Sequence, residues 1–284
     1  MSPGIHYALG AMLLFGVGDL IYKRGAAAGA LPHQFLMVQS WVFLPTVAAY
    51  GLATGSLHFV AGTLWGLPVG VFVLTGFYNF AHSLKSGRVS VNAPVFRLSF
   101  VITAGLAVAL LGEPLTAFKF AGISLALAAV WLLLGAPAGG DAGRRESRSS
   151  LTRVLVATAA VGIGNFVYKY GLRAGATPAS LIVAQAAVVV SCSTALVRIL
   201  DRRIRPSRAV LRNAPMAGVA IALAFCLMVE SLARGDASVM VPVAQMGFVA
   251  TSLFGFVFLR EPFSARKGAG LVAALAALAS LAGG

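Results

Sequence analysis

The chain has 284 residues, of which 59% are hydrophobic and only 11% are charged, and it carries a formal net charge of +14. A soluble domain carries about 25% charged residues because its surface faces water. A water-soluble enzyme, a disordered chain and a secreted disulfide scaffold are therefore excluded, and the composition indicates a polytopic membrane protein. The basic residues lie between apolar segments, as residues that anchor cytoplasmic loops do. They form no basic soluble module, so we expect no nucleic-acid partner.

Ten apolar segments follow one another along the chain, each close to the roughly 20 residues that a helical membrane crossing needs. They lie at 6–28, 32–54, 63–84, 90–111, 116–135, 153–174, 178–200, 211–233, 238–259 and 266–282. The longest connection, 136–150, is a polar linker rich in Gly, Arg and Ser. It divides the chain into a first repeat, 1–135, and a second repeat, 151–284. We expect an all-α integral membrane fold of ten transmembrane helices.

The two halves match in sequence, and the match includes polar positions. With a shift of 146 residues, 16–39 is identical to 162–185 at 10 of 24 positions. With a shift of 148 residues, 83–126 is identical to 231–274 at 18 of 44 positions. Helices rich in Ala and Gly resemble one another by chance, but not at the same polar and proline positions. The matched positions include Tyr22/Tyr168, Lys23/Lys169, Gln39/Gln185, Pro94/Pro242 and Glu113/Glu261.

An odd number of spans in each repeat predicts that the two halves insert with opposite orientation. This is the inverted-repeat plan of secondary transporters, whose substrate site lies near the midplane between the halves. Of the 22 basic residues, 16 fall at connections that follow odd-numbered spans, and only Lys119, Arg173 and Arg234 fall on the opposite side. The positive-inside rule then predicts that both termini lie outside the cytoplasm.

Sequence motifs for catalysis and for cofactors are missing from the chain. It has no phosphate-binding loop, no zinc-protease motif and no nucleophile elbow, so we expect no enzyme activity, no cofactor and no metal. The two cysteines, Cys192 and Cys226, lie far apart in apolar stretches, which argues against a disulfide framework.

Two sets of repeated motifs carry a resemblance to a known family. The first set is GVGDLIYKRGAAAGALP and GIGNFVYKYGLRAGATP, and the second combines Gly-x-x-Ser-Val-x-x-Pro with Glu-Pro nineteen residues later. With these motifs the chain resembles the drug/metabolite transporter superfamily, EamA type. The resemblance implies a transporter whose first helix in each repeat carries a basic residue close to the cavity, here Lys23 and Lys169. Many relatives keep both termini in the cytoplasm, whereas the charge count predicts the reverse.

Ionisable residues inside spans are the strongest site candidates, because each costs about 2.5–3.5 kcal/mol on insertion scales. Asp19 and Lys23 lie four residues apart on one helical face and form either a functional pair or a merely structural one. In the second repeat Lys169 matches Lys23, but the neutral Asn165 stands at the position of Asp19. Lys169 therefore needs another counter-charge, which is either the substrate or Glu230.

Arg97 is a further ionisable candidate, at the position where the second repeat carries Gln245. A guanidinium cannot lose its proton and binds carboxylate or phosphate, so its partner is either the substrate or an acid such as Asp19 or Glu230. Asp19, Glu230 and His82 could take up a proton during transport, since burial raises the pKa of a carboxyl group and imidazole titrates near neutrality. Alternatively, Glu230 and His82 lie close enough to the membrane–water interface to remain hydrated and play no part in transport.

Neutral hydrogen-bonding residues complete the predicted site, although such groups also hold helices together in lipid. They are Tyr22, Tyr168, Asn165, Gln39, Gln185, Tyr78, Asn79 and Gln245. Glu113-Pro114 and Glu261-Pro262 have a different interpretation. A carboxylate beside a proline at the start of a helix satisfies free N–H groups and suits the helix dipole.

Together these patterns predict a secondary transporter that exports a small polar metabolite, such as an amino acid or an organic anion, across a bacterial inner membrane. We expect alternating access, linked to protons, with the cavity between spans 1, 3, 4, 6, 8 and 9. The alternatives are efflux of cationic drugs and translocation of a lipid-linked anion. The expected partners are a small-molecule substrate and the bilayer, with the chain acting as a monomer or a homodimer.

Overall fold

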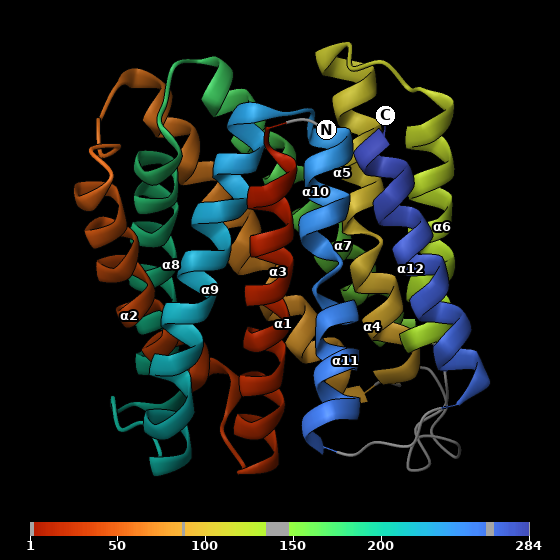
Figure 1. Ribbon diagram of the computed structural model, residues 1–284. Coiled ribbons are helices and arrows are strands. Elements are labelled where there is room, and N and C mark those ends of the chain that lie inside the picture. Colours follow the sequence, from red (N-terminus) through yellow and green to blue (C-terminus); the bar gives the residue numbers. More distant parts are fainter. Residues whose placement is uncertain (1–2, 87–88, 135–147, 260–263, 284) are drawn as a thin grey trace.

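The computed structural model describes residues 3–86, 89–134, 148–259 and 264–283, and they form one bundle of helices without strands (Figure 1). This confirms the predicted all-α fold. In the first half the elements are α1 (Ile5–Ala27), α2 (Pro32–Ala53), the 3₁₀ helix η1 (Ala61–Trp65), α3 (Gly66–Ser86), α4 (Val89–Arg97), α5 (Ser99–Leu111) and α6 (Ala117–Leu134). In the second half they are α7 (Arg148–Arg173), α8 (Pro178–Asp201), α9 (Arg208–Arg234), α10 (Ala237–Gln245), α11 (Gly247–Leu259) and α12 (Ala265–Gly283).

The helices correspond to the ten predicted spans. Within the described residues, nine helical segments are long and apolar enough to cross a membrane, and α6 is a shorter apolar helix. Three crossings consist of two pieces each: η1 with α3, α4 with α5, and α10 with α11. The predicted ends are close, and α7 shows a clear difference, since it begins at Arg148 rather than at 153.

The fourth span of each repeat is interrupted at a matched position, a feature absent from the predicted spans. The interruptions lie at Leu98 and Met246, 148 residues apart. At each, the backbone N–H bonds to the carbonyl three residues earlier, at 3.1 Å and 3.2 Å, which is a 3₁₀ turn. Pro94 and Pro242 lie one turn before, where proline removes a helical hydrogen bond and bends the chain. Discontinuous helices of this kind are typical of transporter binding regions.

The halves interlock through two matched contacts. α1 of the first half packs on α11, and α7 of the second half packs on α5. The Thr251 hydroxyl donates to the Gly16 carbonyl at 3.3 Å, and the Thr103 hydroxyl donates to the Gly162 carbonyl at 2.9 Å. Neither glycine has room for a side chain, because an added Cβ would lie 2.6 Å and 2.7 Å from its nearest neighbour. The duplicated sequence therefore builds the same joint twice.

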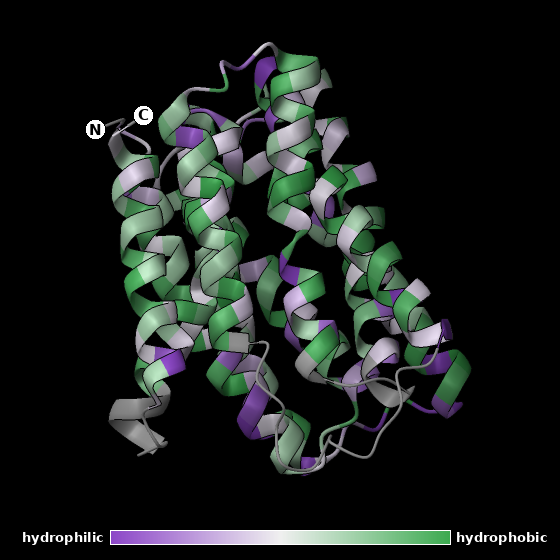
Figure 2. Ribbon diagram, turned by 90° about the vertical axis from the view of Figure 1, so that its right-hand side faces the viewer, coloured by the Kyte–Doolittle hydropathy of each residue, from purple (hydrophilic) through white to green (hydrophobic). Residues whose placement is uncertain are grey.

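The bundle has two chemically different ends. Both chain termini lie at one end, at the top of Figure 1, which we call the terminal end. The connection from α8 to α9, teal at the bottom of Figure 1, carries Arg202, Arg203 and Arg205, so we call that end the basic end. Hydrophilic residues gather toward the ends and hydrophobic residues cover the middle (Figure 2). The arrangement suits a membrane-spanning bundle, while the cytoplasmic location of the basic end stays a prediction.

Candidate functional site

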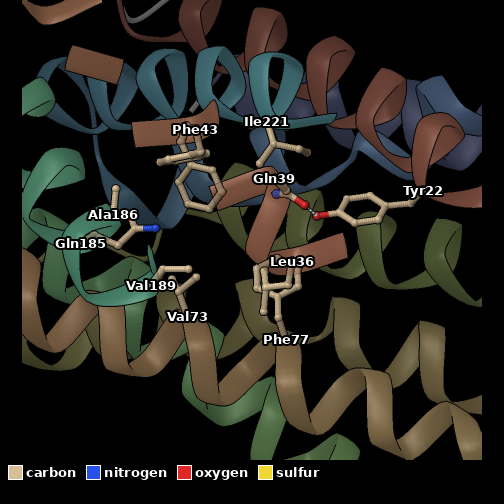
Figure 3. Close-up of a pocket in the computed structure, with 11 residues that line it drawn as sticks. Tyr22, Leu36, Gln39, Phe43, Val73, Phe77, Gln185, Ala186, Val189 and Ile221 are labelled. Atoms are coloured by element: carbon tan, nitrogen blue, oxygen red, sulfur yellow. Dashed lines mark hydrogen bonds between the residues drawn. The ribbon is translucent and has the colours of Figure 1, made fainter. Parts of the chain in front are cut away.

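A small pocket lies between helices of both halves, near the middle of their length (Figure 3). Its free volume is about 30 Å³, room for a few water molecules at most. Among the described residues that line it, none is charged. They are Tyr22, Leu36, Gln39, Phe43, Val73, Phe77, Gln185, Ala186, Val189, Ile221 and Phe225.

The position of the pocket differs in part from the prediction. The lining comes from α1, α2 and α3 in the first half and from α8 and α9 in the second, which correspond to spans 1, 2, 3, 7 and 8. Spans 1, 3 and 8 were expected, and spans 2 and 7 take the place of spans 4, 6 and 9. The backbones pack closely at Gly16 and Gly162, where an added Cβ would lie 2.6 Å and 2.7 Å from its nearest neighbour, so α11 lies against α1 and α5 lies against α7.

Three of the predicted polar residues meet at this pocket. The Tyr22 hydroxyl of α1 donates a hydrogen bond to Oε1 of Gln39 in α2, drawn as a dashed line in Figure 3. Gln185 of α8 lies on the opposite side, and it is 3% exposed with no hydrogen-bond partner for its Oε1. The pocket therefore combines aromatic and aliphatic walls with two carboxamides and one phenol.

Two further predicted residues, Asn165 and Tyr168, lie on α7 behind the pocket wall. Tyr168 is completely buried, its ring centroid lies 6.4 Å from that of the pocket residue Phe225, and its hydroxyl has no hydrogen-bond partner. Asn165, one helical turn earlier, is 3% exposed, and its Nδ2 also lacks a partner. A buried polar group without a hydrogen bond is unfavourable and calls for an explanation.

Asp19 and Arg97 form an ion pair within the bundle. Nη2 of Arg97 lies 2.7 Å from Oδ2 of Asp19, and the Thr251 hydroxyl oxygen lies 3.2 Å from the same oxygen. Arg97 is the last residue of α4, directly before the interruption at Leu98, so the pair ties the broken span to α1 and α11. Of the partners considered from sequence, Asp19 is the one that Arg97 contacts. Gln245, at the matched place before the second interruption, is half-buried.

The two matched lysines differ in their surroundings. Lys23, near the end of α1, is exposed. Lys169 is half-buried, and its Nζ donates to the Leu232 carbonyl at 2.6 Å and to the Gly235 carbonyl at 2.7 Å. The last carbonyls of a helix have no helical partner and attract cations. Lys169 therefore binds the end of α9, and neither lysine lines the pocket.

A cluster of ionic contacts joins the halves next to Lys169. The Glu113 carboxylate accepts hydrogen bonds from the backbone N–H groups of Ala237 at 2.8 Å and Ser238 at 2.9 Å, at the start of α10. Lys119 of α6 forms an ion pair of 2.7 Å with Asp236. Glu113 thus satisfies free N–H groups at a helix start, as expected, but the helix is α10 rather than the adjacent α6. We call Glu113, Lys119, Lys169 and Asp236 the corner cluster.

Glu230 lies near the corner cluster, at the terminal end of α9. It is 6% exposed and forms an ion pair with Arg234, one turn later on the same helix. The Arg234 guanidinium lies 4.5 Å from the centroid of the Tyr7 ring. Glu230 therefore has a protein partner in this structure and does not line the pocket. Glu261-Pro262 lies outside the described residues.

The remaining predicted residues lie on α3 toward the basic end. Nδ1 of His82 lies 3.1 Å from the Tyr78 carbonyl oxygen, and the two rings have centroids 4.2 Å apart. The Asn79 amide donates to the Thr75 carbonyl at 2.9 Å, which is a local helix contact. None of these side chains lines the pocket.

Sequence reasoning missed the apolar part of the site. Phe43, Phe77 and Phe225 line the pocket, but nothing in their sequence context separates them from core phenylalanines. Thr103 and Thr251 could have been found, because they are identical residues at matched repeat positions. The described residues contain no group of three metal-ligating side chains.

Comparisons with known proteins agree with this architecture. The family model described as "EamA-like transporter family" matches twice, over residues 2–135 and 149–282. No curated protein matches the chain. A solved structure, described only as the crystal structure of a protein, superimposes with a TM-score of 0.83 over 99% of this chain and 98% of that one. The sequence identity is 17%, so this likeness concerns the fold alone.

Proposed function

Because the chain belongs to the EamA-like transporter family, we propose that it is a secondary transporter that moves a small amphipathic metabolite through the central pocket. The two halves would open the pocket alternately to the terminal end and to the basic end. The chain is a multi-pass membrane protein of a transporter family. The identity of the substrate, the direction of transport and its coupling to an ion gradient are proposals.

The observation that carries the proposal is the pocket between the halves, which takes its walls from α1, α2 and α3 on one side and from α8 and α9 on the other. A relative movement of the two halves would therefore change access to every wall. The pocket is complete within one chain, so the proposal needs no second copy.

The lining of the pocket supports an amphipathic substrate without a net charge. Its walls are aromatic and aliphatic, and its polar groups are neutral amides and a phenol. The charged side chains Arg97 and Lys169 bind Asp19 and the end of α9 respectively. A bare carboxylate or ammonium in such a pocket would lose hydration without a counter-charge, which is strongly unfavourable.

The Asp19–Arg97 pair supports a second candidate, proton-linked exchange of an amino acid or organic anion. The side chains of Arg97 and Asp19 are 19% and 30% exposed, so a substrate carboxylate could take the place of Asp19 on Arg97. Asp19 would then take up a proton. In this scheme Asp19→Asn abolishes the coupling of transport to the proton gradient, whereas an amphipathic neutral substrate in the central pocket needs no such exchange.

The proposed direction is export from a bacterial cytoplasm, with the basic end facing the cytoplasm. The excess of basic residues at connections after odd-numbered spans supports this orientation.

Cysteine labelling tests the proposal without knowledge of the substrate. Ala186 lines the pocket and is 1% exposed, whereas Ala187, the next residue of α8, is exposed on the outer face of the bundle. The two native thiols, Cys192 and Cys226, are first replaced by Ser and Ala. Ala186→Cys and Ala187→Cys are then labelled with a membrane-impermeant maleimide in right-side-out and in inside-out vesicles.

We expect Ala186→Cys to react from both sides of the membrane and Ala187→Cys, which faces lipid at the same depth, to react from neither. Reaction of Ala186→Cys from one side only, or from neither side, would contradict alternating access through this pocket. The matched control separates true pocket access from penetration of the reagent into lipid.

A further inference from the structure

One pair of residues occurs in both repeats in two different states. In the first repeat the Tyr22 hydroxyl is bonded to the Gln39 carboxamide, 17 residues later. In the second repeat Tyr168 and Gln185 have the same spacing, but the Tyr168 hydroxyl and the Gln185 Oε1 both lack a partner. We call Tyr22 and Gln39, which bind each other, the closed pair, and Tyr168 and Gln185, whose polar atoms lack partners, the open pair.

The second repeat carries neutral residues where the first repeat carries its ion pair. Asn165 stands at the position of Asp19, and Gln245 stands at the position of Arg97. The Nδ2 of Asn165, one turn from Tyr168, is also buried without a partner. Asn165, Tyr168 and Gln185, each at least 97% buried, therefore leave donors and acceptors unused, whereas their first-repeat counterparts Asp19, Tyr22 and Gln39 have partners.

We infer that Tyr168 and Gln185 form the subsite that recognises an uncharged head group of the substrate, either a hydroxyl or a primary amide. The inference rests on the proposed function, since it concerns the substrate of the same pocket. Gln185 lines the pocket directly, and Tyr168 packs on Phe225, which also lines it. The subsite opens when the wall at Phe225 moves.

The chemistry of the open pair selects the head group. A phenol O–H donates and accepts, and a carboxamide carries an acceptor and two donors. The Gln185 Oε1 needs a donor and the Tyr168 O–H can donate to an acceptor, so a hydroxyl or a primary amide, which donates and accepts, satisfies both. A carboxylate only accepts and an ammonium only donates, and the described residues that line the pocket offer neither a counter-charge. Sites built to hydrogen-bond a hydroxyl reject analogues that lack it.

A panel of compounds with one body and different heads tests the inference. The body is 3-phenylpropyl, because three phenylalanines line the pocket. The heads are hydroxyl, primary amide, carboxylate, ammonium and hydrogen. Binding is measured by the thermal stabilisation of the detergent-solubilised protein, for the natural sequence and for Tyr168→Phe and Gln185→Leu. Tyr78→Phe and Gln34→Leu are the matched controls, since Tyr78 lies on α3 toward the basic end and the Gln34 amide donates to Asp201 at that end.

We expect the alcohol and the amide to bind more tightly than the other three compounds. We expect Tyr168→Phe and Gln185→Leu each to weaken alcohol binding by about tenfold or more, and the two controls to leave it unchanged. Equal binding to all variants would overturn the inference, as would preferential binding of the carboxylate or the ammonium, or no binding by any compound. If the head-group pattern fails while Ala186→Cys still reacts from both sides, only the subsite is wrong and the transport proposal stands.

Discussion

The two repeats share a scaffold but differ in how they satisfy the polar groups that the scaffold holds. In the first repeat the polar positions bind one another, through the Asp19–Arg97 ion pair and the Tyr22–Gln39 hydrogen bond. In the second repeat the matched positions are neutral, and three of them leave atoms without a partner. These matched positions are Asn165, Gln245, Tyr168 and Gln185.

This difference shows which features of a duplicated chain must stay alike. The joints between the halves need Gly16 and Gly162 for close approach and Thr103 and Thr251 for a hydrogen bond, so the same residues occur twice. Among the polar positions the Tyr/Gln pair is also repeated, whereas Asn165 and Gln245 replace Asp19 and Arg97. One set closes on itself and holds the broken span in place, whereas the other set remains available to a ligand.

The largest expected effect comes from breaking the ion pair of the first repeat. Asp19→Asn leaves Arg97 without its carboxylate, and Arg97→Gln leaves Asp19 without its guanidinium. Because both side chains are partly exposed, at 19% and 30%, each single variant should cost about 2 kcal/mol of stability, below the 3–5 kcal/mol typical of a fully buried pair. Unfolding of the purified protein by denaturant measures this loss.

The double variant Asp19→Asn with Arg97→Gln gives the first repeat the residue types of the second. It should recover most of the stability, because no charge is left without a partner. Gln245→Leu in the second repeat is the control, and it should change stability by less than about 0.5 kcal/mol. Additive losses in the double variant would contradict the account of this pair.

A somewhat smaller effect is expected at the matched lysines. Lys169→Met removes two charge-assisted hydrogen bonds to the end of α9 and should cost about 2 kcal/mol or slightly less. Lys23→Met, at an exposed position, should cost less. Thermal midpoints of the two variants compare them directly. Equal losses would mean that the repeats use this lysine alike, and a larger loss for Lys23→Met would reverse the expected order; either result would contradict the prediction.

Much of the fold could be predicted from the sequence because hydrophobic length and repeat matching are strong signals. The ten spans and their duplication follow from apolar runs of nearly constant length. The interruptions at Leu98 and Met246 were not predicted, although Pro94 and Pro242 mark them. A proline inside an apolar run bends a helix or breaks it, and sequence alone does not decide between the two outcomes.

The site could be predicted only in its polar part. Tyr22, Gln39 and Gln185 were singled out as neutral groups inside spans, and all three line the pocket. The ionisable residues were singled out by the cost of burying them, but sequence does not show which charge meets which partner. Lys169 illustrates this, because its partners are backbone carbonyls, which every residue carries.

The most direct test of the central claim compares the same substitution in the two repeats. Tyr22→Phe removes a hydrogen bond between helices and should lower stability by about 0.6 kcal/mol. Tyr168→Phe removes a buried hydroxyl that has no partner and should raise stability by up to about 1 kcal/mol. The measurement is denaturant unfolding of both variants without any ligand. Shifts of opposite sign are the predicted result, and a loss of stability in both variants would contradict the claim that one pair is closed and the other open.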